Sequence, residues 1–111
     1  MNQASATVPV EEIETLEENE TALLPLYHVV LWDDDEHSFE YVISMLNDLF
    51  GYPKTKGFQL AKRVDRDGRT VVFTSNFEVA ELKRDQILAY GKDERIKKCT
   101  GSMWATIEKV S

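Results

Sequence analysis

The stretch VVLWDDDEHSFEYVISML, from Val29 to Leu46, joins two local patterns across four consecutive acidic residues. Its first part is apolar and β-branched, and it predicts a strand from Tyr27 to Trp32. Its last part has apolar residues at spacings of three and four, which predict an amphipathic helix from Ser38 to Phe50. Residues 33–36 therefore lie at a strand-to-helix junction, where a rigid scaffold holds side chains beside open surface.

The residues alone leave the role of this acidic run open. Carboxylates favour the positive N-terminal end of a helix, and carboxylate oxygens also bind Ca²⁺ or Mg²⁺. The run D-D-D-E lacks the alternate spacing and the glycine of an EF-hand, which disfavours a calcium loop. His28 and His37 are interpreted as surface residues or as residues with satisfied hydrogen bonds, rather than as metal ligands.

The remaining chain predicts two further helices and two further strands. A helix opens at Lys54 or Thr55, and a turn at residues 65–68 separates it from a strand at residues 69–74. Ser75 or Asn76 caps a helix that runs from Phe77 to Tyr90, with Glu78 completing a capping box. A last strand covers residues 102–110. The predicted inward-facing residues of these segments include Phe58, Ala61, Val64, Phe77, Ala80, Ile87, Leu88, Met103, Ala105 and Ile107, and both Trp32 and Trp104 are predicted to be core residues.

The order β-α-α-β-α-β predicts an α+β domain, with three short strands in a small, mostly antiparallel sheet and the helices on one face. A length of 111 residues suits one domain. We expect this domain to span residues 25–111. Residues 1–24 have no sustained period and no aromatic residue, and they predict a disordered acidic tail.

Composition excludes several classes of function. The chain carries 20 acidic and 13 basic residues, so no basic patch indicates nucleic acid, and no apolar run reaches membrane-spanning length. The single cysteine, Cys99, forms no internal disulfide and suits a reducing cytoplasm. No P-loop, dinucleotide fingerprint, CxxC pair or Ser-His-Asp order is present. We therefore expect a monomer in the cytoplasm, without a cofactor.

Three motifs in order resemble the ClpS-type adaptors, which recognise N-degrons for the Clp AAA+ protease. The segment DDDEHSFEYV is similar to their signature N-D-D-x-T-P-M-E-F-V. The segment FEVAELK, from Phe77 to Lys83, is similar to their A-E-V-A-E-x-K helix, and GSMWATIE, from Gly101 to Glu108, is similar to their closing G-S-M-x-A-T-I-E strand. The resemblance covers residues 26–110.

The resemblance implies a non-enzymatic adaptor that binds proteins with a bulky hydrophobic first residue. It places the free α-ammonium group at Asp33, Asp34 and Asp65. It implies that Glu78 and Lys83 dock on the N-terminal domain of a ClpA- or ClpC-type unfoldase. The walls of the side-chain cup would be Asp35, His37, Phe39, Val42, Ala61, Val64 and Met103.

Several positions depart from the family pattern. Asp33 replaces an asparagine and Asp65 replaces a histidine, so three carboxylates are expected to share one pocket and to raise at least one pKa. Ala61 and Phe39 each replace a methionine, which predicts altered side-chain selectivity. His37 and Ser38 stand where the family has threonine and proline. The alternative is an interaction domain of the same fold that regulates the unfoldase, or that binds another ligand such as a divalent cation.

Overall fold

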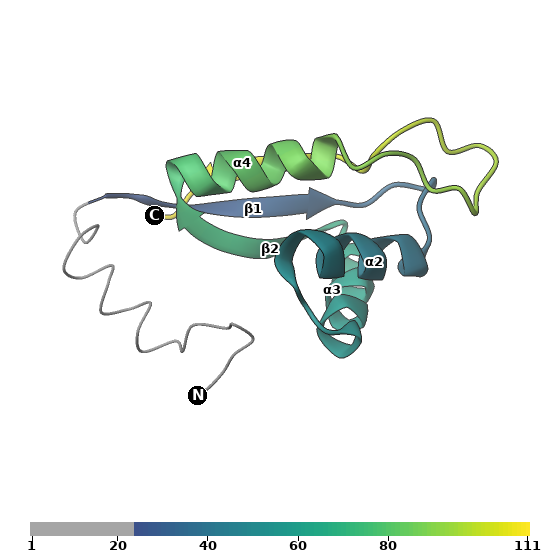
Figure 1. Cartoon of the computed structure of the whole chain (residues 1–111). Helices are drawn as coiled ribbons and strands as arrows, with labels where there is room; N and C mark the ends of the chain where they lie inside the picture. The colour runs from purple at the N-terminus through teal and green to yellow at the C-terminus, as the bar shows by residue number, and fades with distance from the viewer. Residues whose placement is uncertain (1–23) are drawn as a thin grey trace.

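Residues 24–111 are described in the computed structural model, and the rest of the predicted tail lies outside them. β1 (Leu26–Trp32) is the central strand and pairs antiparallel with β2 (Arg69–Asn76), as Figure 1 shows. It also pairs antiparallel with β3 (Ala105–Lys109) on its other edge. The helices are α2 (Phe39–Phe50), α3 (Lys54–Asp67) and α4 (Phe77–Leu88). The predicted α+β class and element order are confirmed, and the sheet order is β2-β1-β3.

One hydrophobic core lies on the face of the sheet that carries Val29 and Leu31. Alternation along a strand places these two side chains on the same face, and both are fully buried there. Met45 of α2, Val64 of α3 and Ile87 of α4 join the same cluster. All three helices therefore pack against one face of the sheet, as the sequence predicted.

The opposite face of the sheet is held by polar contacts between neighbouring strands. The Nε1 group of Trp32 donates to Thr106 Oγ1 at 2.8 Å, and the Arg69 guanidinium lies 4.9 Å from the centre of the Trp32 ring. Arg69 also pairs with Glu108 at 2.7 Å. Such cross-strand pairs stabilise a sheet face that no helix covers.

Three residues predicted to face the core are exposed instead. Trp104 is 61% exposed, because Met103 and Ala105 on either side of it point inward and alternation sends Trp104 outward. Phe58 is 45% exposed because the buried row of α3 runs through Gly57, Ala61 and Val64 beside it. Phe77 is the first residue of α4, and its ring lies at the sheet margin with its edge against Tyr27.

Two predicted boundaries were wrong. The turn expected at residues 65–68 is the last turn of α3, which ends at Gly68 with a φ of 84°. Asp65 is therefore a helical residue. β2 continues to Asn76, whose side chain caps α4 by accepting from the Val79 amide, so the capping box predicted from Ser75 to Glu78 does not form.

A glycine sets the distance between α2 and α3. A Cβ atom at Gly57 would lie 3.3 Å from the Cα of Ile43, a backbone atom that is not free to move away. Gly57 is buried, and the absence of a side chain allows the two helices to pack closely. This packing fixes the position of Ala61 and Val64 relative to α2.

The long loop between α4 and β3 is anchored to the start of α2 (Figure 1). The buried carboxylate of Asp93 accepts from the Ser38 amide at 2.8 Å and from the Ser38 hydroxyl at 2.7 Å, and it also accepts from the Arg95 amide at 3.0 Å. Cys99, expected in a polar loop, is buried, and its Sγ accepts from the Asp93 amide. Burial opposes ionisation of Asp93, but these hydrogen bonds prevail and lower its pKa to about 2.

We predict that Gly57→Val lowers the free energy of unfolding by about 1–3 kcal/mol, because the added side chain forces α2 and α3 apart. Gln59→Val is the control, because it places a valine in the same helix at an exposed position. Urea denaturation measures both variants. Equal losses in the two would show that the helix contact is unimportant.

We predict that Asp93→Ala lowers the free energy of unfolding by about 2 kcal/mol at neutral pH, because the start of α2 loses its acceptor. The folded-state pKa lies below the ordinary value of 3.8, so this stabilisation is complete above about pH 4 and is lost as the pH falls toward 2. Urea denaturation between pH 7 and pH 2 checks both points. Asp67→Ala, an exposed carboxylate paired with Arg66, is the control and should cost much less than Asp93→Ala; an equal loss in the two would contradict the anchoring role.

Candidate functional site

The acidic turn begins where β1 meets the end of α3. The Asp33 amide donates to the carbonyl of Gly68 at 2.9 Å, and Gly68 caps α3. Asp65 lies in the last turn of that helix. The backbone thus brings together two carboxylates that are 32 residues apart in the sequence.

The electrostatic environment of Asp33 includes the charge of Asp65. Partial burial raises the pKa of Asp33 above its ordinary value, the Asp34 amide opposes this rise, and the charges of Asp65, Asp34 and Asp35 add to it. Within residues 24–111, neither Asp33 nor Asp65 forms an ion pair. A cationic group placed between them would relieve this repulsion.

Asp34 has a different role, because it is held by His37. The Nδ1 atom of His37 lies 2.7 and 2.9 Å from the two carboxylate oxygens of Asp34, and the Nε2 atom lies 2.7 Å from the carbonyl oxygen of Gly101. Both ring nitrogens therefore have hydrogen-bond partners within the protein. The His37 side chain is only 3% exposed. This agrees with the interpretation of His37 as a residue with satisfied hydrogen bonds.

Most predicted cup residues lie in one apolar group between α2, α3 and the start of β3. Val42, Ala61, Val64 and Met103 are buried in the core, and Phe39 packs against it. The Phe39 ring also contacts the exposed Phe58 ring, with 5.9 Å between their centres. Asp35 is exposed on the turn and adds no apolar surface.

Sequence reasoning missed the contribution of the loop between α4 and β3. Cys99 Sγ lies 3.3 Å from His37 Nε2 and 3.2 Å from the Gly101 carbonyl oxygen, and Thr100 donates its amide to Glu36 at 3.2 Å. The loop therefore forms one side of the site. No signal in the sequence marks Asp93 or Cys99 as contacts of residues 37 and 38.

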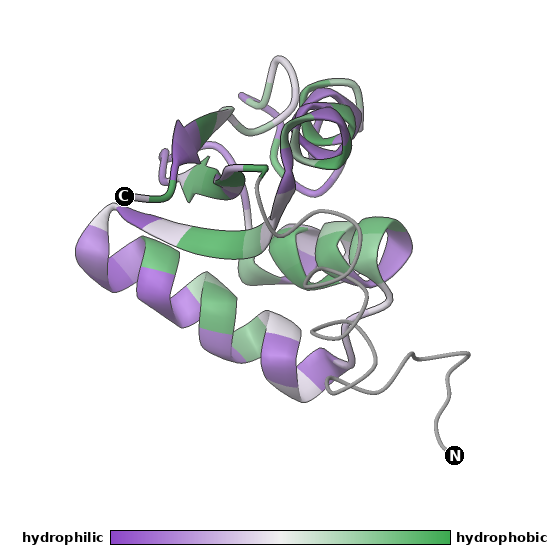
Figure 2. Cartoon of the chain, turned by 90° about the vertical axis from the view of Figure 1, so that its left-hand side faces the viewer, coloured by the Kyte–Doolittle hydropathy of each residue, from purple (hydrophilic) through white to green (hydrophobic). Residues whose placement is uncertain are grey.

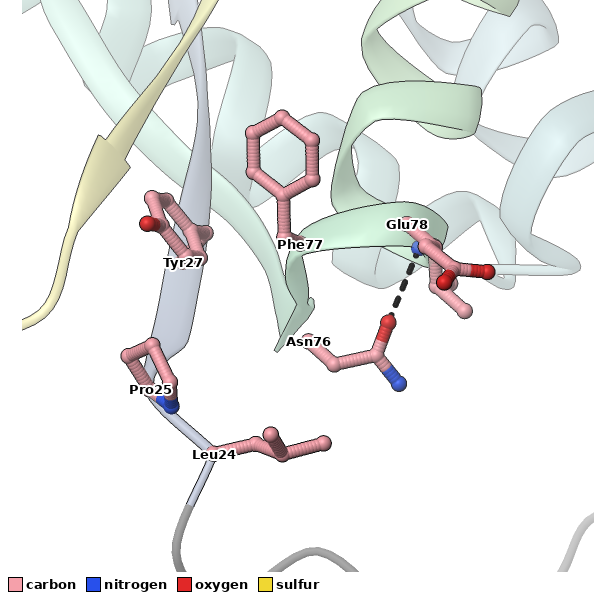
Figure 3. A pocket seen from close by; sticks show the side chains of 7 residues that line it. Leu24, Pro25, Tyr27, Asn76, Phe77 and Glu78 are labelled. Atoms are coloured by element: carbon pink, nitrogen blue, oxygen red, sulfur yellow. Dashed lines mark hydrogen bonds between the residues drawn. The ribbon is translucent and has the colours of Figure 1, made fainter.

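The predicted docking residues occupy different positions on α4. Glu78 is exposed in the first turn, beside a hollow of about 360 Å³ that Leu24, Pro25, Tyr27 and Phe77 also line (Figure 3). Lys83 is partly buried, and its ammonium donates to the Leu49 carbonyl oxygen at 2.6 Å, at the C-terminal end of α2. A cation there also complements the helix dipole.

Residues 24–111 contain no group of three or more His, Cys, Asp or Glu side chains arranged to hold a metal ion. None of the helices in this part of the chain is long and apolar enough to cross a membrane.

Comparisons with known proteins agree with this geometry. Residues 23–98 match the family model for the ATP-dependent Clp protease adaptor protein ClpS. The ClpS adapter of Vibrio cholerae is 32% identical over 84 residues, which cover 74% of this chain and 79% of that protein. The ClpS adapter of Roseobacter denitrificans is 32% identical over 68 residues, which cover 61% of this chain and 60% of that protein.

A solved structure of Agrobacterium tumefaciens ClpS2 bound to L-phenylalaninamide superposes with a TM-score of 0.67. It is 26% identical in sequence and covers 78% of this chain and 98% of that one. Adaptors of this kind are not enzymes, in agreement with the expectation from the sequence. Taken with the motifs and the fold, these matches show that the chain belongs to the ClpS family of ATP-dependent Clp protease adaptors.

Proposed function

We propose that this adaptor binds the free α-ammonium group and the first side chain of N-degron proteins and delivers them to a Clp AAA+ unfoldase. The observation that carries the proposal is the juxtaposition of Asp33 and Asp65, two carboxylates without a cationic partner in the described part of the chain. An ammonium group has three donors and one positive charge, so it suits such a pair. The related ClpS2 binds L-phenylalaninamide, a molecule with a free α-amine and an aromatic side chain, which supports the same class of ligand here.

The proposal divides the ammonium site into two parts. Asp33 and Asp65 supply charge that is not yet neutralised, whereas Asp34 is already shared with His37 and the Glu36 amide. We infer that Asp34 mainly orients the turn, and that one of its carboxylate oxygens also accepts a hydrogen bond from the ligand. This assignment follows from the number of acceptors each carboxylate has left.

The energies suit a reversible adaptor. Charge-assisted hydrogen bonds contribute roughly 1.5–3 kcal/mol each, and burial of one large side chain contributes a similar amount. Three bonds and one side chain give roughly 6–12 kcal/mol, of which association costs at least about 4 kcal/mol. The remainder of at most about 8 kcal/mol corresponds to a micromolar dissociation constant.

The first side chain is proposed to enter beside Phe39, between α2 and α3. The buried walls at Val42, Ala61, Val64 and Met103 expose little surface, so the Phe39 and Phe58 rings must move apart to admit it. Ala61 leaves more space at the wall than the methionine of the family pattern, and Phe39 makes the rim bulkier. These two changes are proposed to alter which first residues are preferred.

We further propose that the face of α4 with Glu78 and Lys83 docks on the N-terminal domain of a ClpA- or ClpC-type unfoldase. The hollow beside Glu78 and the exposed Leu82 give this face apolar surface next to charge. The adaptor is proposed to act as a monomer in the cytoplasm. Asp35 and His37 complete the rim of the site in this proposal.

We predict that short peptides with a free N-terminus and a bulky first residue bind at micromolar strength, and that acetylation of the α-amine removes binding. Asp65→Ala should weaken binding at least about tenfold, because it removes a charge-assisted hydrogen bond. Fluorescence anisotropy with peptides that differ only in the first residue measures both effects.

Asp67→Ala is the matched control for Asp65→Ala, because Asp67 is exposed on the same helix end and pairs with Arg66. Binding should also weaken in acid, since protonated Asp33 attracts no cation and its pKa is raised above 3.8. If free and acetylated peptides bind equally at neutral pH, the α-amine is not recognised and the proposal fails.

We predict that Glu78→Ala weakens binding to an unfoldase N-terminal domain by about tenfold without changing peptide affinity. Lys83→Ala should also weaken docking, but with some loss of stability because its bond to Leu49 is removed. Calorimetric titration against the isolated domain, with thermal melting of each variant, separates the two causes. Asp85→Ala on the same helix is the control, and an equal effect of all three variants would contradict a specific docking face.

A further inference from the structure

Basic side chains gather on the two segments that flank the acidic turn. Of the 13 Lys and Arg residues in the chain, five lie in α3 and four lie in residues 92–98 of the loop before β3. Hydrophilic bands recur along α3, the lowest helix in Figure 2. The basic residues of the two flanks are Lys54, Lys56, Lys62, Arg63 and Arg66 on α3, and Lys92, Arg95, Lys97 and Lys98 in the loop.

The α3 flank is continuous with the mouth of the proposed cup. Phe39 at the start of α2 contacts Phe58, and the ammonium group of Lys62 lies 5.4 Å from the centre of the Phe58 ring. Lys62 directly follows Ala61, a wall residue, and precedes Asp65 by almost one helical turn. A chain that leaves the cup over the Phe58 side of α3 therefore passes Lys62.

The loop flank lies on the other side of the same turn. Gly101 accepts from His37 and Thr100 donates to Glu36, so this end of the loop is fixed against residues 36 and 37. Lys97 and Lys98 precede the buried Cys99 and are exposed. A chain that leaves the cup on this side also meets basic residues.

The charges on these flanks are largely uncompensated. Within residues 24–111, Lys62, Arg63, Lys97 and Lys98 form no ion pair. Asp67 pairs with Arg66, and Asp65 lies near Asp33 and forms no ion pair within residues 24–111. The carboxylates of Asp33 and Asp65 thus lie between two segments that are rich in basic residues, the α3 flank and the loop flank.

We propose that these flanks select N-degron proteins in which the first residue is followed by acidic residues at positions two to four. This inference rests on the function proposed above. Asp33 and Asp65 attract the α-ammonium group, and the basic flanks attract carboxylates a few residues further along the N-degron protein. Basic residues at those positions would be repelled from both flanks.

The test uses the full chain and peptides that begin with Phe and carry Glu, Ser or Lys at positions two to four. An exposed charge pair changes affinity by a factor of about 1.4 to 5. We expect the Glu peptide to bind at least about fivefold more tightly than the Lys peptide at low salt, with the ratio falling toward one in about 0.5 M salt. Each peptide is also measured with an acetylated N-terminus.

Charge reversal locates the effect. Lys62→Glu, or Lys97→Glu with Lys98→Glu, should reduce or invert the preference for Glu peptides. Lys109→Glu is the matched control and should leave it unchanged, because Lys109 pairs with Tyr27 at the opposite end of β1 from Asp33.

The outcomes separate the two proposals. If acetylation has no effect on any peptide, the proposed function fails. If acetylation removes binding but the Glu and Lys peptides bind equally, only the present inference is overturned. It is also overturned if the flanks bind an acetylated peptide of residues 1–23, which carries six Glu, while showing no preference among the Phe peptides.

Discussion

The site depends on the imidazole of His37, which is held between two acceptors. One ring nitrogen contacts the Asp34 carboxylate, and the other contacts the Gly101 carbonyl oxygen. These bonds join the acidic turn to the loop before β3, which are 64 residues apart in the sequence. The hydrogen bonds from Ser38 to Asp93 join the same two segments one residue later. Adjacent links of this kind fix the start of α2, and with it the rim of the cup.

The contact between His37 and Asp34 also gives the carboxylates of the turn different roles. Both carboxylate oxygens of Asp34 already contact His37 Nδ1, so Asp34 has less capacity left to accept hydrogen bonds from a ligand. Asp33 and Asp65 form no ion pair in the described residues, and partial burial, with a smaller contribution from the charge of Asp65, raises the pKa of Asp33. Four consecutive acidic residues in the sequence therefore do not act as one cluster. One is an internal anchor, one faces a carboxylate from α3, and Asp35 remains exposed.

The sequence predicted those features that repeat along the chain or depend on neighbouring residues. Apolar spacing located α2, and Ser38 and Gly51 mark its ends as predicted. Gly57 lowers the intrinsic helix propensity of α3, yet that glycine permits its close contact with α2. Trp104 and Phe58 were assigned to the core from their hydrophobicity, but the strand and helix geometry turns them outward. Contacts between distant segments, such as Asp93 with Ser38, have no periodic signal and became visible only in the fold.

The paired carboxylates also bear on how such a site distinguishes its ligands. Two like charges held together by backbone contacts make the empty site less stable than one with a neutral donor in place of one carboxylate. An α-ammonium group removes this repulsion, whereas an acetylated amine is neutral and leaves both carboxylates unpaired. The difference in free energy between the two ligands is therefore larger than with an asparagine and a histidine in these positions. If the proposed function holds, Asp33 and Asp65 therefore shift selectivity away from the size of the first side chain and toward the charge of the amine beside it.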